Sequence, residues 1–177
     1  MRTGLFFTGL TLAVAAGYAA AGQRPARPPD IFFAPTRQTI VDAMLRLARV
    51  TADDVVYDLG SGDGRIVVIA AQKFRARAVG IELDPKLVAL SRELAVGSEV
   101  EDRVTFVEGD MFTTDLSPAT VVTLYLSESI NLDLEPKLRN ELRKGSRIVS
   151  HQFRMGRWQP DETRVVEGEE LFLWRVP

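Results

Sequence analysis

The stretch DLGSGDG, residues 58–64, is the part of this sequence whose composition most directly predicts ligand binding. It follows an apolar run and holds three glycines, which let a backbone approach a ligand closely and adopt dihedral angles that a side chain forbids. A dinucleotide-binding loop would carry glycine at the sixth position counted from Gly60, where this chain has Arg65. Asp58 and Asp63 also place negative charge where a pyrophosphate would lie. The loop therefore predicts a ligand with a positive group, and the residues expected to line it are Asp58, Gly60, Ser61, Gly62, Asp63 and Gly64.

Two further acids extend this prediction. Glu82 ends a second apolar run, 22 residues after Gly60, at a position where a carboxylate accepts hydrogen bonds from both hydroxyls of a ribose. Asp110, in the stretch EGDMF, follows a third apolar run and is placed to accept from an adenine amino group. A single acid after a strand is a common loop residue or helix cap, so the prediction depends on all three acids following the glycine loop in this order.

The segments around these residues alternate between patterns typical of strands and patterns typical of helices. Because each strand is a near-continuous apolar run, we expect an α/β fold: a doubly wound, mostly parallel, Rossmann-like sheet covered on both faces, with a C-terminal antiparallel hairpin. Ligands bind such sheets at the carboxyl ends of the strands, where strand order reverses. The expected strands are residues 54–58, 78–83, 103–109, 120–126 and 146–153, the expected helices are 37–50, 65–74, 85–95 and 134–142, and the hairpin spans 163–176 around a GEE turn.

Two residues are candidate helix caps. Thr36 precedes the first expected helix, where a hydroxyl can accept from a free backbone N–H. Gly145 follows the last expected helix, where glycine commonly ends a helix in the left-handed conformation.

Composition restricts the class of protein. The chain has 177 residues, 46% hydrophobic and 26% charged, as in an ordinary globular domain. The formal net charge of -2 disfavours a nucleic-acid partner, which usually requires a basic face. With no cysteine and one histidine, a thiolate zinc site and a histidine metal cluster are excluded, and we expect no metal.

The first 22 residues differ from the rest. Gly4–Ala21 contains no charge and ends in small residues, as in a secretory signal peptide, and its 18 residues also approach the length of a membrane-spanning helix. Residues 1–22 are therefore a signal peptide or a membrane anchor. Residues 23–30 are a linker rich in proline and arginine, and residues 31–177 form the globular domain.

Several quoted motifs resemble those of a known family. VVYDLGSGDGRIVVIAA, AVGIELD, RVTFVEGD and VVTLYL resemble class I S-adenosylmethionine-dependent methyltransferases. APT before the first helix, PKLRNELRKGSRIVSHQF and the following tryptophan resemble a smaller family that includes mitochondrial protein-lysine methyltransferases, whose members modify the ATP synthase c subunit and the adenine nucleotide translocase. This resemblance, over residues 32–158, implies S-adenosyl-L-methionine as cofactor and an accessible lysine of a protein as substrate.

The resemblance also implies roles for the acids. Asp58 would reach the ammonium group of the cofactor, Glu82 its ribose, and Asp110 the adenine N6. Leu83 and Met111 would lie on the two faces of the adenine ring.

Thr36 has a second interpretation within this family. It would belong to an N-terminal lid and bind the cofactor carboxylate, instead of capping a helix. The family usually has proline at the next position, where this chain has Arg37.

The substrate side is expected at the ends of the fourth and fifth strands. Tyr125 would orient an amine with its hydroxyl or ring face, or belong only to the core. Glu128 would attract a cationic amine, or be a solvated surface acid. His151 would accept a proton, or be a structural histidine, the more common case. For Trp158 we expect a role in closing the core.

Three functions remain open at this stage. The first is a membrane-associated protein-lysine methyltransferase. A small-molecule methyltransferase is the second, although the short C-terminal tail offers little to enclose a small substrate. The third is a module that binds the cofactor without catalysis. Since S-adenosylmethionine is made in the cytoplasm, a retained anchor with the domain facing the cofactor fits better than export after cleavage of a signal.

Overall fold

The structure is a computed structural model, and it describes residues 34–177. The expected signal or anchor (1–22) and linker (23–30) lie outside the described residues. Between residues 34 and 177, no helix is both long and apolar enough to cross a membrane.

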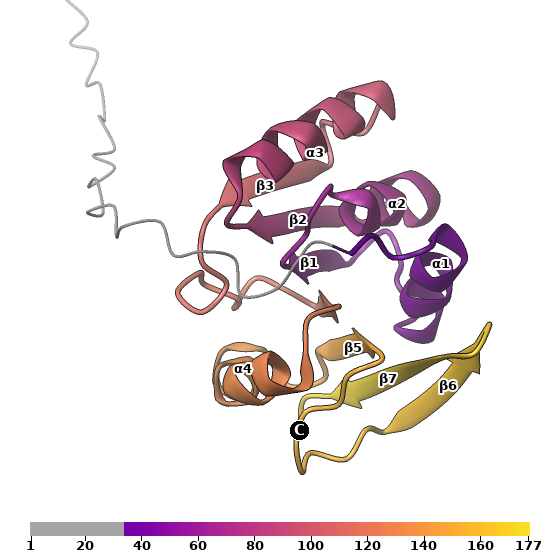
Figure 1. The fold of residues 1–177 in the computed structure, drawn as a ribbon, viewed down its shortest axis with the longest axis vertical. Helices are drawn as coiled ribbons and strands as arrows, with labels where there is room; N and C mark the ends of the chain where they lie inside the picture. Colours follow the sequence, from indigo (N-terminus) through magenta and orange to yellow (C-terminus); the bar gives the residue numbers. More distant parts are fainter. Residues whose placement is uncertain (1–33) are drawn as a thin grey trace, which may run out of the picture.

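One seven-stranded sheet forms the centre of the molecule, with strand order β3-β2-β1-β4-β5-β7-β6 (Figure 1). Neighbouring strands from β3 to β5 are parallel, while β7 runs antiparallel to both β5 and β6. The expected fold class is therefore confirmed. Strand order reverses between β1 and β4, which places the predicted ligand site at their carboxyl ends. The strands are β1 Val55–Leu59, β2 Arg77–Glu82, β3 Val104–Glu108, β4 Val121–Leu124, β5 Arg147–His151, β6 Glu162–Val166 and β7 Glu169–Arg175.

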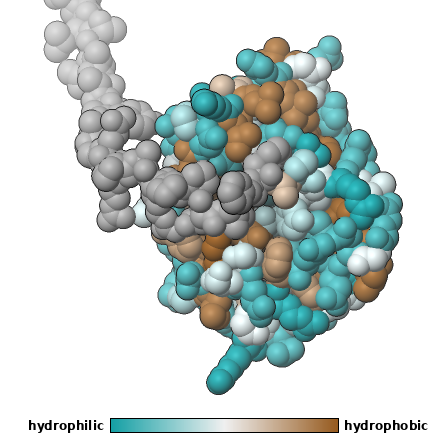
Figure 2. Space-filling model, viewed as in Figure 1, coloured by the Kyte–Doolittle hydropathy of each residue, from teal (hydrophilic) through white to brown (hydrophobic). Residues whose placement is uncertain are grey.

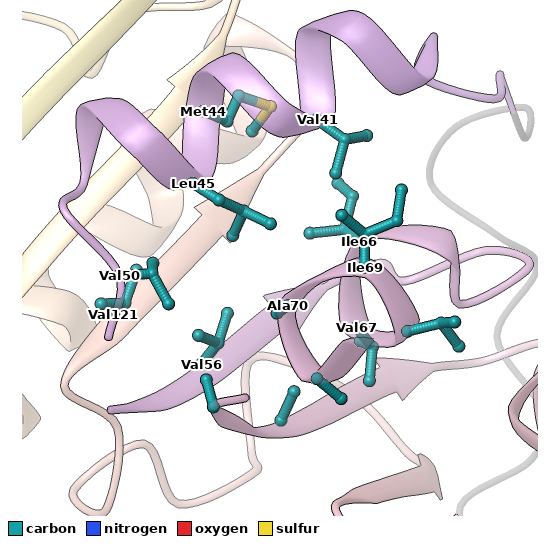
Figure 3. Packing of buried hydrophobic residues seen from close by; sticks show 14 of the residues in the cluster. Val41, Met44, Leu45, Val50, Val56, Ile66, Val67, Ile69, Ala70 and Val121 are labelled. Carbon is teal, nitrogen blue, oxygen red and sulfur yellow. The ribbon is translucent and has the colours of Figure 1, made fainter. Parts of the chain in front are cut away.

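The helices cover the two faces unequally: α1 (Gln38–Leu47), α2 (Arg65–Phe74) and α3 (Pro85–Gly97) lie on one face, and α4 (Glu128–Glu141) on the other (Figure 1). Successive strand residues point to opposite faces, so Val56 packs with the first group and Tyr57 with the second. Figure 3 shows Leu45 of α1 and Ala70 of α2 gathered over Val56. These clusters fix β1, and with it the loop that follows.

Helix α3 leaves apolar side chains at the surface, and Figure 2 shows hydrophobic surface over this helix. Leu90, Leu94 and Val96 are 47%, 37% and 62% exposed. Leu94 and Val96 lie in the second half of α3 and Leu90 lies near its middle, and the helix runs away from the carboxyl ends of the parallel strands. This surface is therefore separate from the predicted ligand site.

Both predicted helix caps are wrong. Arg37, not Thr36, is the N-cap of α1, and its side chain makes no capping hydrogen bond. Helix α4 ends at Glu141, and Gly145 lies beyond it in a turn with φ +84°. Since Gly145 N donates to Val176 O at 2.8 Å, the glycine joins the turn to the end of the chain after β7.

Two expected boundaries also shift. Helix α4 begins at Glu128, six residues before the expected start, because Ser127 Oγ accepts from Ile130 N at 3.3 Å and caps it. The hairpin turns at Glu167 and Gly168, with φ +53° and +84°, not around GEE. Positive φ at both central residues suits a two-residue turn whose twist matches the strands.

Candidate cofactor and substrate site

The glycine loop leaves β1 in a conformation that requires glycine. Gly60, Gly62 and Gly64 have φ of +73°, +55° and +79°, where side chains are disfavoured. A Cβ on Gly60 would lie 2.8 Å from Leu126 Cδ2. The N–H groups of Gly60 and Ser61 both donate to Ile81 O, at 2.9 and 3.0 Å. The loop is therefore held between β2 and the segment after β4, and Gly60 itself is exposed.

Asp58 is a buried carboxyl group at the end of β1, with 2% of its surface exposed. Burial raises its pKa from 3.8 to about 7, and the neighbouring carboxylates of Glu82 and Asp63 act in the same direction. Thr123 Oγ1 donates to Asp58 Oδ1 at 2.7 Å and partly opposes this rise. A buried carboxylate in such surroundings is stabilised by a cation, so Asp58 suits a positively charged ligand group.

The carboxylate of Glu82 is held by three backbone N–H groups. Oε2 accepts from Gly62 N at 2.9 Å, and Oε1 accepts from Leu83 N and Asp84 N at 2.8 and 2.9 Å. An ionised carboxylate offers about four acceptor sites, so about one remains for a hydroxyl group of a ligand. The structure thus places Glu82 directly beside the glycine loop, as predicted, with a fixed orientation.

Asp110 lies at the neighbouring strand end, because Gly109 N donates to Glu82 O at 2.9 Å and holds the end of β3 against β2. Its Oδ1 accepts from Phe112 N at 2.8 Å. Leu83 is half-buried, whereas Met111 is 6% exposed and packs into the core on the α4 side. The acids are brought together, and the contacts of Leu83 and Met111 with an adenine ring stay predictions.

Asp63 does not stand as a free charge in the loop. It forms an ion pair with Arg65, whose Nη2 lies 2.5 Å from Oδ2 and whose Nε lies 3.0 Å from Oδ1. This pairing raises the pKa of Arg65 further. Arg65 Nη1 also donates to Thr36 O at 2.9 Å. The buried Thr36 is therefore tied to the glycine loop through its carbonyl group, which the sequence did not predict.

Tyr125 and His151 meet on the predicted substrate side. Tyr125 directly follows β4 and is half-buried, while His151 ends β5 and is 3% exposed. Their ring centroids are 4.1 Å apart, with planes inclined by 33°. Glu128 is exposed at the first turn of α4, a position where an acid also favours the helix dipole. The first two side chains thus form a pair, and Glu128 lies on the surface, three residues after Tyr125 in the sequence.

Trp158 closes the core beside α4, as expected. It is half-buried and packs against the buried residues under this helix. The guanidinium of Arg139 lies 3.6 Å from its ring centroid, and Trp174 Nε1 donates to its carbonyl at 2.9 Å.

The comparisons with known proteins agree with this geometry. Residues 58–162 match the model of the ANTKMT methyltransferase domain. The chain belongs to this family. A protein-lysine N-methyltransferase of Saccharolobus islandicus (strain REY15A) is 41% identical over 144 residues, which cover 81% of this chain and 89% of the relative. The adenine nucleotide translocase lysine N-methyltransferase of Mus musculus is 39% identical, over 68% of this chain and 52% of that protein.

Among solved structures, the RNA methyltransferase of Salinibacter ruber in complex with S-adenosyl-L-homocysteine resembles this ANTKMT-family chain with a TM-score of 0.80. It is 52% identical and covers 81% of this chain and 94% of its own. Fold, family and these relatives make the chain an S-adenosylmethionine-dependent methyltransferase.

The site fits S-adenosylmethionine on observations from the structure itself. The cofactor carries an ammonium and a sulfonium group, which suit the buried Asp58 and its acidic neighbours. Its ribose suits Glu82, whose carboxylate is fixed by three N–H donors. Gly60 has φ +73°, where a side chain is strained, and as an exposed glycine it lets the backbone lie close to a cofactor. Within residues 34–177, no group of three or more acidic or histidine side chains is arranged so that it could hold a metal ion.

Two buried polar residues that support the site were missed from the sequence. Thr123 is the register partner of Asp58 across β1 and β4, and its only signal was a hydroxyl inside an apolar strand. Asn131 in α4 donates from Nδ2 to Ser150 Oγ and to Phe153 O, both at 3.1 Å. It fixes the segment that follows β5, and the polar pattern around it gave no signal.

Proposed function

We propose that this chain is a protein-lysine N-methyltransferase that acts on a membrane-associated protein. The observation that carries this proposal is the pairing of Tyr125 with His151 at the carboxyl ends of β4 and β5, the same edge of the sheet that bears the three ordered acids. The connections 109–120 and 152–161 contain no helix. A small substrate usually needs an inserted lid to exclude water, whereas a protein substrate supplies its own covering surface.

The residues of the site have separate roles in methyl transfer. The cofactor supplies a methyl group on a sulfonium. Asp58 and Glu82 bind and orient it, and Tyr125 receives the amine with its ring face and hydroxyl. A lysine must lose a proton first, and its reference pKa is about 10.4. Desolvation beneath the covering protein favours that loss, so no dedicated base is needed. Glu128 at the surface attracts the cationic amine before it is desolvated.

The choice of a membrane-associated substrate draws on two supports. One relative in Mus musculus is named as a lysine N-methyltransferase of the adenine nucleotide translocase, and one in Homo sapiens as that of the ATP synthase c subunit. The matches span 52% and 58% of the lengths of these two relatives. The charge-free run Gly4–Ala21 supports a membrane anchor that keeps the domain on the side that holds the cofactor. Sequencing the N-terminus of the protein from its cells tests the anchor, and a chain starting at Gly22 overturns it.

RNA is the second candidate substrate, because the Salinibacter ruber relative is described as an RNA methyltransferase. The formal net charge of -2 weighs against it, since RNA-binding surfaces are usually basic.

The test is methyl transfer from labelled S-adenosylmethionine to fractions of cells that lack the gene, with the full-length chain as enzyme. Asp58→Asn is the blank, and Asp53→Asn, which changes an exposed acid, is the matched control. A labelled protein band in the membrane fraction, made by wild type and control but not by the blank, supports the proposal. Label removed by ribonuclease indicates RNA, and label only in small molecules indicates the small-molecule alternative. Cofactor binding without any transfer indicates a non-catalytic module.

A further inference from the structure

A cluster of charges joins the start of α1 to the hairpin of β6 and β7. Arg37 Nη1 lies 2.9 Å from Glu167 Oε2, and its Nη2 lies 3.0 Å from Glu169 Oε1. Thr39 Oγ1 donates to Glu167 Oε2 at 3.0 Å. Exposed ion pairs contribute little to stability, and the Arg37 side chain is 54% exposed. Stability alone therefore gives little reason for this arrangement.

The other oxygen of Glu169 points to the substrate side. Glu169 Oε2 lies 3.2 Å from His151 Nε2 and also accepts from Gln152 Nε2. Because a carboxylate only accepts hydrogen bonds, His151 carries its proton on Nε2. Its Nδ1 is buried and has no hydrogen-bond partner among residues 34–177. The ring of Tyr125 lies over this imidazole.

We propose that Glu169 is a positioning residue for methyl transfer, held by Arg37, which fixes the His151 ring and through it the orientation of Tyr125. The inference rests on the proposed function, because it concerns how Tyr125 receives the amine. It gives Arg37 a role at a position where the family resemblance led us to expect proline. Glu169 and Arg37 are not expected to touch the cofactor or the amine, so they act only through the two rings.

Burial is the main cause that favours the neutral form of the imidazole. Burial lowers the pKa of His151 below its ordinary value, Glu169 opposes this, and Arg37 acts with burial. These groups come from β7 and from the segment before α1, and Tyr125 packs on the ring from the end of β4. A protonated His151 under Tyr125 would repel both a lysine ammonium and a sulfonium. Arg37 therefore partly offsets the effect of the Glu169 carboxylate on the pKa of His151.

His151 is the sole histidine of the chain, so its imidazole can be observed alone. We would record long-range ¹⁵N–¹H spectra and a pH titration of the full-length chain, labelled on histidine and free of a histidine tag, together with kcat and KM. Wild type is expected to show the Nε2–H tautomer. The variant is Glu169→Ala. The matched control is Glu170→Ala at the next position, which is exposed and 4.0 Å from Arg154.

Glu169→Ala is expected to give a mixture of tautomers and at least about a tenfold lower kcat, because misplaced reacting groups lose much of their rate, with KM for the cofactor unchanged. Glu169→Gln keeps an accepting oxygen and is expected to restore the tautomer and most of kcat. It also serves as the folded comparison if the alanine variant is unstable. Arg37→Gln is expected to raise the pKa of His151, and Glu169→Gln to lower it.

The inference is overturned if Glu169→Ala shows the same imidazole signals and the same kcat as the control Glu170→Ala. A wild type with its proton on Nδ1 also overturns it. The spectra need no turnover, so they separate this inference from the proposed function. If the wild type transfers no methyl group, the proposed function is refuted. If the tautomers and the opposite pKa changes in Arg37→Gln and Glu169→Gln are nevertheless as expected, the positioning of the ring is still supported.

Discussion

Asp58→Asn is expected to stabilise the cofactor-free protein at pH 8 and to change its stability little near pH 4. The carboxyl group is buried, and its pKa rises from 3.8 to about 7 on folding. The folded state therefore holds this proton more tightly than the unfolded state does. The stability that Asp58 contributes is complete below pH 3.8 and is lost as the pH rises through about 7. Asparagine has no proton to lose, so the variant escapes this loss.

The size of the effect follows from the two pKa values. The difference between 3.8 and about 7 corresponds to about 4 kcal/mol of unfolding free energy, at about 1.4 kcal/mol for each pH unit. Part of this loss has already occurred by pH 5, because the unfolded state is ionised there. Between pH 5 and pH 8 the advantage of Asp58→Asn over wild type is expected to grow by about 3 kcal/mol.

Urea unfolding of the full-length chain at pH 5, 6, 7 and 8, without cofactor, measures this growth. Asp53→Asn, at an exposed acid five residues earlier, controls for the general effect of removing a charge. If all three proteins keep the same stability differences across this range, Asp58 is already ionised in the folded state at pH 5. The argument from burial is then refuted.

The same titration governs cofactor binding. An ammonium group favours the ionised form of Asp58, so binding displaces the proton below pH 7. We expect the Kd of wild type for S-adenosylmethionine to rise about tenfold for each pH unit below about 7. In Asp58→Asn, binding is weaker and nearly independent of pH over the same range. Calorimetry at pH 5.5, 6.5 and 7.5 measures both slopes, and parallel slopes exclude Asp58 as the group that titrates.

Three further substitutions test the site. Gly60→Ala, with φ +73° and a Cβ 2.8 Å from Leu126, is expected to cost about 1–3 kcal/mol in urea unfolding and to weaken cofactor binding; unchanged values contradict the close approach. Glu82→Gln removes a charged acceptor and is expected to raise the cofactor Kd about 10- to 100-fold by calorimetry, whereas an unchanged Kd removes Glu82 from the ribose site. Tyr125→Phe is expected to lower the rate constant of methyl transfer about five- to tenfold in single-turnover assays, and an unchanged rate constant would show that the hydroxyl takes no part.

The sequence predicted the parts of this site that depend on local patterns. Helix α2 spans residues 65–74, as expected. Its N-cap is Gly64 in the left-handed conformation, and this glycine sets the start of the helix. The order of the acids at strand ends followed from counting apolar runs. Thr123 could not be found in the same way, since its contact with Asp58 joins residues 65 positions apart. That contact exists only because β4 lies next to β1, which no local pattern states.

The extent of helix α4 could not be predicted from local patterns. Helix α4 was expected to begin at residue 134, yet it begins at Glu128 and continues through Pro136. Proline removes one N–H from a helix and usually ends or bends it. Here the buried Leu134 and Leu138 hold α4 against the sheet on both sides of the proline. Tertiary packing thus overrides the local preference, and a single sequence carries little information on such packing.

The segment before α1 links the cofactor side of the site to the substrate side. Substitutions at Arg37 and at Glu169 are therefore expected to have different effects. Thr36 O accepts from Arg65, which pairs with Asp63 in the glycine loop. The next residue, Arg37, pairs with Glu169, which holds the histidine of the substrate side. A change at Arg37 that also displaces Thr36 is therefore expected to alter cofactor affinity and turnover together. Glu169 lies on the substrate side of Arg37, so a substitution there is expected to alter turnover alone.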